Sequence, residues 1–479
     1  MVRTSRLDGL GKALSNATMV LACAILLWAP LPLGSNRPWS WSLLAAAIAL
    51  TLLVWAAAQL AGTSPQSKAV WPVVAAAATT APVWAWAFVQ TLPASTFAWL
   101  APPAIWAQAL EAGTVEAVPR VGLDAEGGGD ALMRLICYAA MFWLAWRLAL
   151  DAVRARRLLA VILVTATLCA AYGLIAHFAG WEAIGWIPKT AYLGDVTGTF
   201  VNRNSFATYA NLGVVICLAL LAEPLLAARA PGELRRLAVQ MMQQTLERRL
   251  LVLLALGILV TASLRSHSRG GLLSLALTVA VMAVLLFLVA RPRLPAVLAV
   301  LTATIAAGWM LVAISGAGTL ERIGQIDANY DLEEAGRLAY WQVSLGMVAE
   351  RPWQGFGYGN FEEAFAQYRD ERFNDRVDMA HNTYIEHLVE LGVPATVLLY
   401  LGPLVLFLYC LRGLFARRRN QLFPLAAVGA TVLVALHALV DFSLQIPAVA
   451  VTYAALLGIG VAQATPSKGR PGSADGLRD

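Results

Sequence analysis

The chain has 479 residues, of which 59% are hydrophobic and only 13% are charged, and its formal net charge is +6. A soluble protein of this length needs charged side chains over the surfaces of several domains, so the composition excludes that class. Basic residues beside anionic lipid headgroups account for the positive charge, and a nucleic-acid partner is not required.

Apolar runs of about 20 residues recur along nearly the whole chain, and each is long enough to cross the membrane core as a helix. The sequence therefore predicts an all-α fold, a polytopic transmembrane helical bundle that forms a single membrane domain over residues 1–479. About twelve spans are expected, at residues 15–33, 40–61, 69–90, 131–150, 158–177, 205–228, 250–264, 271–290, 294–314, 384–411, 422–441 and 446–464.

Most of the 35 lysines and arginines fall on every second connection between these spans. Cytoplasmic loops carry the excess of basic residues in inner-membrane proteins, so this alternation orients the bundle. It predicts cytoplasmic N- and C-termini and leaves residues 91–130 and 315–383 on the periplasmic side.

Both of these outer segments are long. Residues 91–130 end in a Glu-Gly-Gly-Gly-Asp run that we expect to be a flexible approach to the next span. Residues 315–383 form the large periplasmic loop between spans 9 and 10, and two helices are expected in it, at about 331–350 and 361–372. The glycine-rich run from Gly355 to Gly359 between these helices is read as a turn.

Three arginines lie at the outer ends of spans, where the preference of basic residues for cytoplasmic loops does not explain them: Arg203, Arg265 and Arg269. The seventh apolar run is short, so we expect its helix to continue through Arg265 and Arg269, which would then share a face. An arginine inside the membrane costs about 2.5–3.5 kcal/mol on insertion scales. Neither motif contains an acidic residue, so an exogenous anion such as a phosphate is the expected partner. The alternative is that the side chains extend to lipid phosphates.

Arg337 is a fourth candidate, although Glu333 and Glu334 precede it at the spacing of ordinary surface ion pairs on a helix. Tyr340 and Trp341 follow it and suit either stacking on a sugar ring or a position at the headgroup level.

His381 stands where the large outer loop re-enters the membrane, and a histidine there can act as a general base near neutral pH. His387 is six residues away and off a common helical face, which argues against a helical zinc site. His267 lies among arginines, whose positive charge is expected to keep it neutral.

Four motifs together resemble those of the O-antigen ligase and polysaccharide polymerase superfamily of bacterial membrane proteins. They are GTFVNRNSFA at 198–207, SRGG at 268–271, the run from Gly336 through Pro352 to Phe361, and HNTYIEHLVELG at 381–392. The resemblance covers residues 190–445, an O-antigen ligase-like core. Many relatives have proline where this chain has Arg203.

The resemblance implies a glycosyltransferase that uses no metal or other cofactor and acts at the periplasmic face of the bacterial inner membrane. Its donor would be an undecaprenyl-pyrophosphate-linked glycan, and its acceptor a lipid or a glycan. Arg269, Arg337 and His381 would be catalytic, with His381 as the base. Substrate would bind to Asn202, Arg203, Asn204, Arg265, Tyr340, Trp341 and Asn382.

Three functions stay open at this point. The first is a ligase that moves a finished glycan to a lipid acceptor, and the second is a repeat-unit polymerase or a protein O-oligosaccharyltransferase. The third, of another class, is a transporter or flippase of an anionic lipid-linked substrate. Transporters usually contain internal repeats. No repeat is evident here, and the basic motifs lie at one face, which favours an enzyme.

Overall fold

The computed structural model describes residues 2–62, 70–97, 99–113, 118–227, 233–290, 326–369, 373, 376–417 and 419–465. Side chains are described over the same ranges except 2–8, 233–248 and 326–336.

Helices form nearly all of the regular structure in these ranges. Their bounds are α1 Val2–Trp28, η1 Leu33–Ser35, α2 Pro38–Leu60, α3 Trp71–Gln90, η2 Ala94–Thr96, α4 Ile105–Glu111, α5 Ala125–Leu148, α6 Ala152–Phe178, α7 Arg203–Ala227, α8 Glu233–Arg265, α9 Arg269–Ala290, α12 Ile326–Glu350, α13 Phe361–Ala366, α14 Thr383–Leu391, α15 Val393–Ala416, α16 Leu422–His437, η3 Ser443–Gln445 and α17 Pro447–Ala464. Two short strands, β1 Ala183–Ile184 and β2 Ile187–Pro188, pair antiparallel.

The predicted transmembrane bundle is confirmed as an all-α fold. Within the described residues, nine helices are long and apolar enough to cross a membrane, and α16 is a shorter apolar helix. The expected span 250–264 is the C-terminal part of α8. The expected span 294–314 lies outside the described residues.

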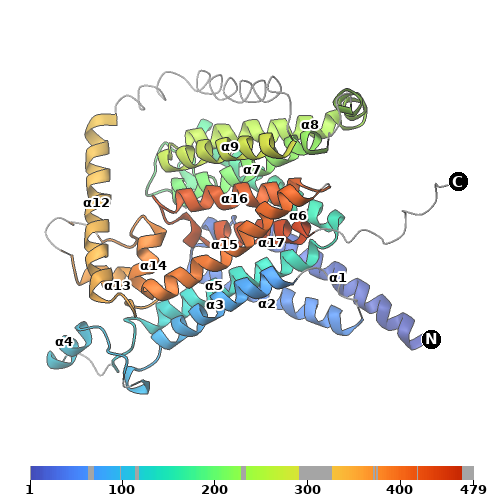
Figure 1. The fold of residues 1–479 in the computed structure, drawn as a ribbon. Coiled ribbons are helices and arrows are strands. Elements are labelled where there is room, and N and C mark those ends of the chain that lie inside the picture. The colour runs from blue at the N-terminus through green and yellow to red at the C-terminus, as the bar shows by residue number, and fades with distance from the viewer. Residues whose placement is uncertain are drawn as a thin grey trace.

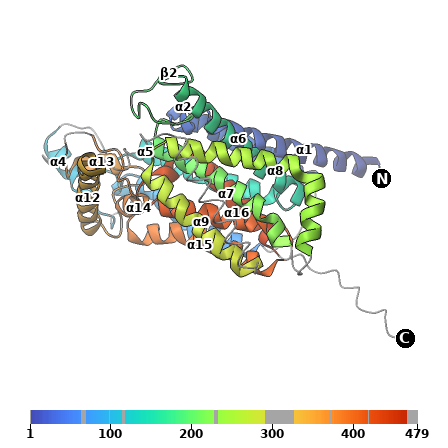
Figure 2. The same cartoon turned by 90° about the horizontal axis from the view of Figure 1, so that it is seen from above.

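The bundle has a buried centre and an extended end. Helix α17 is almost wholly buried and packs against α5 and α16, whereas few residues of α2 and α9 are buried. Helices α4, α12 and α13 lie together at one end of the bundle, opposite the N-terminus (Figures 1 and 2). The two long loops that the sequence assigned to one side of the membrane therefore extend from the same end.

The expected span 384–411 is wrong in its first turns. Gly392, with φ of +77°, separates the short helix α14 from the spanning helix α15. A Cβ on Gly392 would lie 2.7 Å from the backbone of Trp353, so the close approach of these two segments requires glycine.

Residues 126–130 are helical, and the expected flexible segment is wrong. Asp124 caps α5, since its carboxylate accepts hydrogen bonds from the backbone N–H groups of Glu126 and Gly127. A Cβ on Gly128 would lie 3.3 Å from the carbonyl oxygen of Tyr358. The glycines therefore serve close packing rather than flexibility.

In the large loop, α12 starts at Ile326, five residues before the expected start, and ends at Glu350 as predicted. Helix α13 ends at Ala366, six residues early. Residues 315–325 lie outside the described part of the chain.

Candidate functional site

Asn202 is the N-cap residue that stabilises the first turn of α7. Its side-chain oxygen accepts hydrogen bonds from the backbone N–H groups of Asn204 and Ser205, at 2.7 and 3.2 Å, and so caps the helix. The carbonyl oxygen of Asn204 accepts a bond from the Thr208 hydroxyl. Both asparagines thus have structural roles at the point where Arg203 begins the helix, and their predicted role in substrate binding stays a prediction.

Arg203 and His267 converge on one carboxylate. Arg203 Nη1 lies 2.8 Å from Asp195 Oδ2, and His267 Nδ1 lies 2.6 Å from Asp195 Oδ1. Arg203 therefore has an acidic partner that lies outside its motif, and its predicted binding of an exogenous anion stays a prediction. Burial by itself would raise the pKa of Asp195, but the bonds from His267 and Arg203 outweigh it and hold that pKa below its usual value.

The helix predicted to run through Arg265 and Arg269 does not form. Helix α8 ends at Arg265, His267 adopts a left-handed conformation with φ of +53°, and α9 begins at Arg269. The bond from His267 to Asp195 and the bond from the Gly271 N–H to the Ser268 hydroxyl stabilise this turn. The two arginines therefore do not share a face of one helix.

These two arginines have different surroundings. The Arg265 guanidinium lies 5.6 Å from the centre of the Phe178 ring, and the Arg265 carbonyl accepts a bond from the N–H of Val196. Arg269 is exposed, and the next residue, Gly270, approaches His437 so closely that a Cβ would lie 3.2 Å from the imidazole.

His437, at the end of α16, belongs to a buried polar network. Its Nδ1 contacts the Thr208 hydroxyl and lies 3.5 Å from that of Ser443, which donates a 2.8 Å bond to Asp441. Arg337 of α12 lies within electrostatic range of the His437 ring. The start of α9 and the end of α16 therefore meet here, and the charge of Arg337 acts on the same ring.

His381 reaches the same network through Asp441. His381 Nδ1 lies 3.4 Å from Asp441 Oδ1, and its ring packs edge-on against Phe442. Asp441 is 1% exposed. Burial would raise the pKa of Asp441, but bonds from His381 and Ser443 and the nearby imidazole of His437 outweigh it and lower that pKa.

Contacts from three directions fix the backbone at His381, which has φ of +51°. Asn382 caps α14 and donates a 2.9 Å bond to the carbonyl of Leu439. The indole N–H of Trp341 donates to the carbonyl of Ala380, while the Ala380 N–H donates to the carboxylate of Glu386. Asn382 and Trp341 thus position the loop, and their predicted contact with substrate stays a prediction.

Tyr340 packs in an aromatic cluster, with its ring centre 5.9 Å from that of Phe365 and 5.4 Å from that of Phe373. These contacts position α12 against the extended end of the bundle. Tyr340 therefore has a packing role in the structure as well as the predicted role in stacking on a sugar.

Sequence reasoning missed Asp195 and Asp441. Each is an acidic residue in a weakly charged segment close to a membrane span, and such residues are rare unless they have a partner or a function. That signal singles out both residues, although it does not identify their partners, which are distant in sequence.

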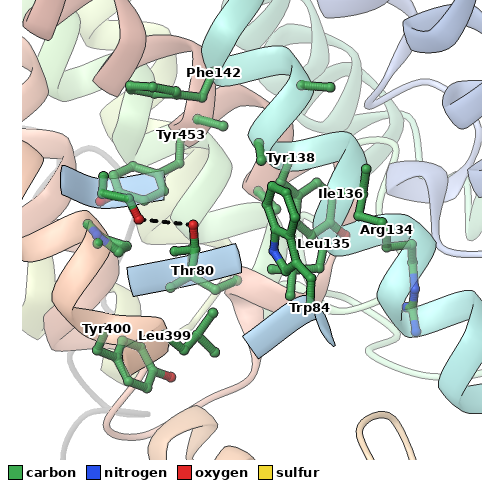
Figure 3. A pocket seen from close by; sticks show the side chains of 18 of the residues that line it. Thr80, Trp84, Arg134, Leu135, Ile136, Tyr138, Phe142, Leu399, Tyr400 and Tyr453 are labelled. Atoms are coloured by element: carbon green, nitrogen blue, oxygen red, sulfur yellow. Dashed lines mark hydrogen bonds between the residues drawn. The ribbon is translucent and has the colours of Figure 1, made fainter. Parts of the chain in front are cut away.

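A separate cavity of about 490 Å³ lies between α3, α5, α15 and α17. Thr80, Trp84 and Tyr453 surround it together with Leu399 and Phe142 (Figure 3). Thr383 and Gln445 belong to its wall, and they also bond to the carbonyl of Asp441 and the carboxylate of Glu386 respectively. The cavity is thus linked to the His381 loop.

No group of three or more His, Cys, Asp and Glu side chains suited to holding a metal ion occurs in the part of the chain that the structure describes.

Comparison with known proteins gives a match to one family. Residues 250–400 match the family described as O-antigen ligase. No curated protein matches the chain. The matched region contains Arg265, Arg269, Arg337 and His381, whereas Arg203 and Asp441 lie outside it.

Proposed function

Because residues 250–400 belong to the O-antigen ligase-like superfamily, we propose that this protein transfers a glycan from an undecaprenyl-pyrophosphate carrier to an acceptor hydroxyl. The reaction would take place at the periplasmic face of a bacterial inner membrane, with both termini in the cytoplasm. The large loop and α4 would then extend into the periplasm, where such a donor presents its sugar.

One observation carries the proposal: His381 bonds to the buried Asp441, beside the start of α9 that bears Arg269 and within reach of the charge of Arg337 on α12. A carboxylate on one nitrogen of an imidazole fixes the ring and its tautomer, so the other nitrogen can accept a proton. A base and a group of cations in one place are what glycosyl transfer from a diphosphate requires.

In the proposed reaction, Nε2 of His381 takes the proton of the acceptor hydroxyl as the oxygen attacks the anomeric carbon. The bond between that carbon and the diphosphate oxygen breaks, and its electron pair leaves with undecaprenyl pyrophosphate. Asp441 stabilises the imidazolium that forms. A single displacement inverts the configuration at the anomeric carbon, and a product with retained configuration by NMR would contradict this.

The arginines would stabilise the charge that grows on the leaving diphosphate, since fixed guanidinium groups act without reorganisation. Arg269, which precedes the glycine that packs against His437, and Arg337, whose charge acts on the His437 ring, are assigned this role. Arg203, oriented by Asp195, and Arg265 would extend the anion-binding surface toward α6 and α7.

The acceptor decides between the subclasses of the proposal. A lipid acceptor makes the protein a ligase, a second lipid-linked glycan makes it a polymerase, and a protein hydroxyl makes it an O-oligosaccharyltransferase. A flippase would need no base, so the His381–Asp441 pair favours an enzyme over a transporter.

The test uses membranes that contain the full chain and are supplied with lipid-linked glycan. We expect Arg269→Gln to reduce the rate of transfer by about 10²–10³-fold and His381→Gln by about 10²–10⁴-fold. Arg412→Gln, on an exposed arginine of α15, is the matched control and should leave the rate unchanged. Full transfer by both site variants, at normal protein levels, would refute the proposal.

A further inference from the structure

The cavity between α3, α5, α15 and α17 is lined mostly by apolar side chains, with a smaller number of polar and charged ones. Leu52, Val73, Leu406 and Leu457 are among the apolar residues. Arg134, Tyr138, His387, Glu390 and Tyr400 are among the others. Such an amphipathic lining suits a molecule with a hydrocarbon chain and a polar head.

The cavity opens sideways between α3 and α5. Ala77 and Ile136 line it and are themselves exposed on the outside of the bundle. Along α3 the lining extends from Val73 to Trp84, which is about 16 Å of helix at 1.5 Å per residue. Because α3 and α5 both qualify as membrane spans, the opening faces lipid hydrocarbon rather than water.

The size of the cavity also favours a hydrocarbon chain as its occupant. Its volume of about 490 Å³ lies within the range of about 300–1,000 Å³ that is typical of ligand pockets. Apolar cavities do not hold stable water, because water needs several polar partners. A hydrocarbon chain that enters from the membrane fills this space without such partners.

The surroundings of Arg134 favour an anionic head. No carboxylate forms an ion pair with Arg134 in the described ranges; its Nε bonds weakly to the carbonyl of Asp130, and its guanidinium lies 4.7 Å from the Trp41 ring. The hydroxyl of Tyr138 is buried and has no hydrogen-bond partner among the described residues. Burial raises the pKa of Glu390, which also belongs to the cavity wall, well above its ordinary value.

We infer that this cavity is a second lipid site, which holds an acyl chain of a membrane lipid whose phosphate binds Arg134 and Tyr138. The assignment to an acyl lipid rests on the proposed function, because the diphosphate of the polyprenyl donor is there assigned to the ends of α7 and α9. Those helices pack against α16, whereas the cavity lies beside α3 and α5, which pack against α15 and α17 (Figure 1).

The test is photolabelling of the purified full chain in nanodiscs. The probe is phosphatidic acid with a diazirine on one acyl chain, and diacylglycerol with the same chain is the uncharged control. We expect phosphatidic acid to label peptides of α3 and α5, and diacylglycerol to label them much less. Unlabelled phosphatidic acid should compete with the probe and reduce the labelling. This competition experiment needs no variant of the protein.

Two variants locate the occupant. Arg134→Gln should reduce the labelling at least about tenfold, as expected for loss of a charge-assisted phosphate contact. Ala139→Phe places a ring in the cavity wall and should abolish the labelling, whereas Ala81→Phe, on the exposed face of α3, should not. Each variant is first checked for an unchanged melting temperature.

Equal labelling by both lipids, labelling confined to other helices, or labelling insensitive to Arg134→Gln would overturn the inference. Displacement of the probe by polyprenyl phosphate in preference to phosphatidic acid would also overturn it, because the cavity would then hold the carrier. Labelling does not require transfer, so these outcomes are distinct from a failure of the proposed glycosyl transfer.

Discussion

Replacement of Asp441 by Asn tests the role of the His381–Asp441 pair directly. In this structure Asp441 Oδ1 faces His381 Nδ1 at 3.4 Å, and Oδ2 accepts the Ser443 hydroxyl at 2.8 Å. An asparagine keeps the size and can keep the bond from Ser443, but its NH₂ group then faces Nδ1 and favours the tautomer that carries its proton on Nε2. That tautomer cannot accept the proton of an acceptor hydroxyl.

The expected loss follows from the type of bond removed. A hydrogen bond to a charged group contributes about 1.5–3 kcal/mol, and each 1.4 kcal/mol corresponds to about a factor of ten in rate. The rate of transfer should therefore fall about tenfold to a hundredfold, while the KM for the lipid-linked donor changes little, because Asp441 is buried and the proposed site assigns it no contact with the diphosphate.

The assay measures kcat and KM for transfer in membranes with the purified lipid-linked glycan. Glu111→Gln, which removes an exposed carboxylate from α4, controls for the change in net charge. If Asp441→Asn kept the full kcat, or lost activity only through a higher KM, the assignment of His381 as a base held by Asp441 would be refuted.

Three further predictions concern stability and the loop. Gly355→Ala should lower the melting temperature, because φ is +65° and a Cβ would lie 2.3 Å from a backbone oxygen, whereas Gly346→Ala, in open space on α12, should not. Asp195→Asn should be less stable than the native chain at pH 7. Since folding lowers the pKa of Asp195 from its ordinary 3.8, this difference should shrink as the pH falls below about 4, and a constant difference from pH 3 to 7 would contradict it. Trp341→Phe removes one bond to the His381 loop and should lower kcat about tenfold or less, with Trp353→Phe, on an exposed ring, as the control.

The membrane spans were predictable because lipid imposes length and apolarity on each helix separately. The turn between α8 and α9 was not, since nothing in the residues from 266 to 268 prevents a helix. The turn depends on the bond from His267 to Asp195, which is 72 residues away in the sequence. The helical conformation of the glycine run was not predictable for a related reason: the packing of Gly127 and Gly128 against residues 358–359 is a tertiary contact.

The distinction between local patterns and tertiary contacts also applies to the candidate site. Motifs identified His381 and the arginines as candidates one at a time, because each lies in a local pattern. The pairing of His381 with Asp441 joins the segment before α14 to the segment after α16, and periodicity along the chain does not reveal it. His437 likewise lies in a polar cluster that connects α7, α9 and α16, which are distant in the sequence.

Gln90, at the end of α3, has a consequence for exchanging parts between related enzymes. Its amide donates to the carbonyls of Gln354 and Glu390 and accepts from the N–H of Tyr358, so it joins the glycine turn to α14. Residues 250–400 alone lack this brace, which belongs to the N-terminal half. A chimaera that places the large loop of this protein in a related enzyme should therefore be most active when the C-terminal end of α3 is transferred together with the loop.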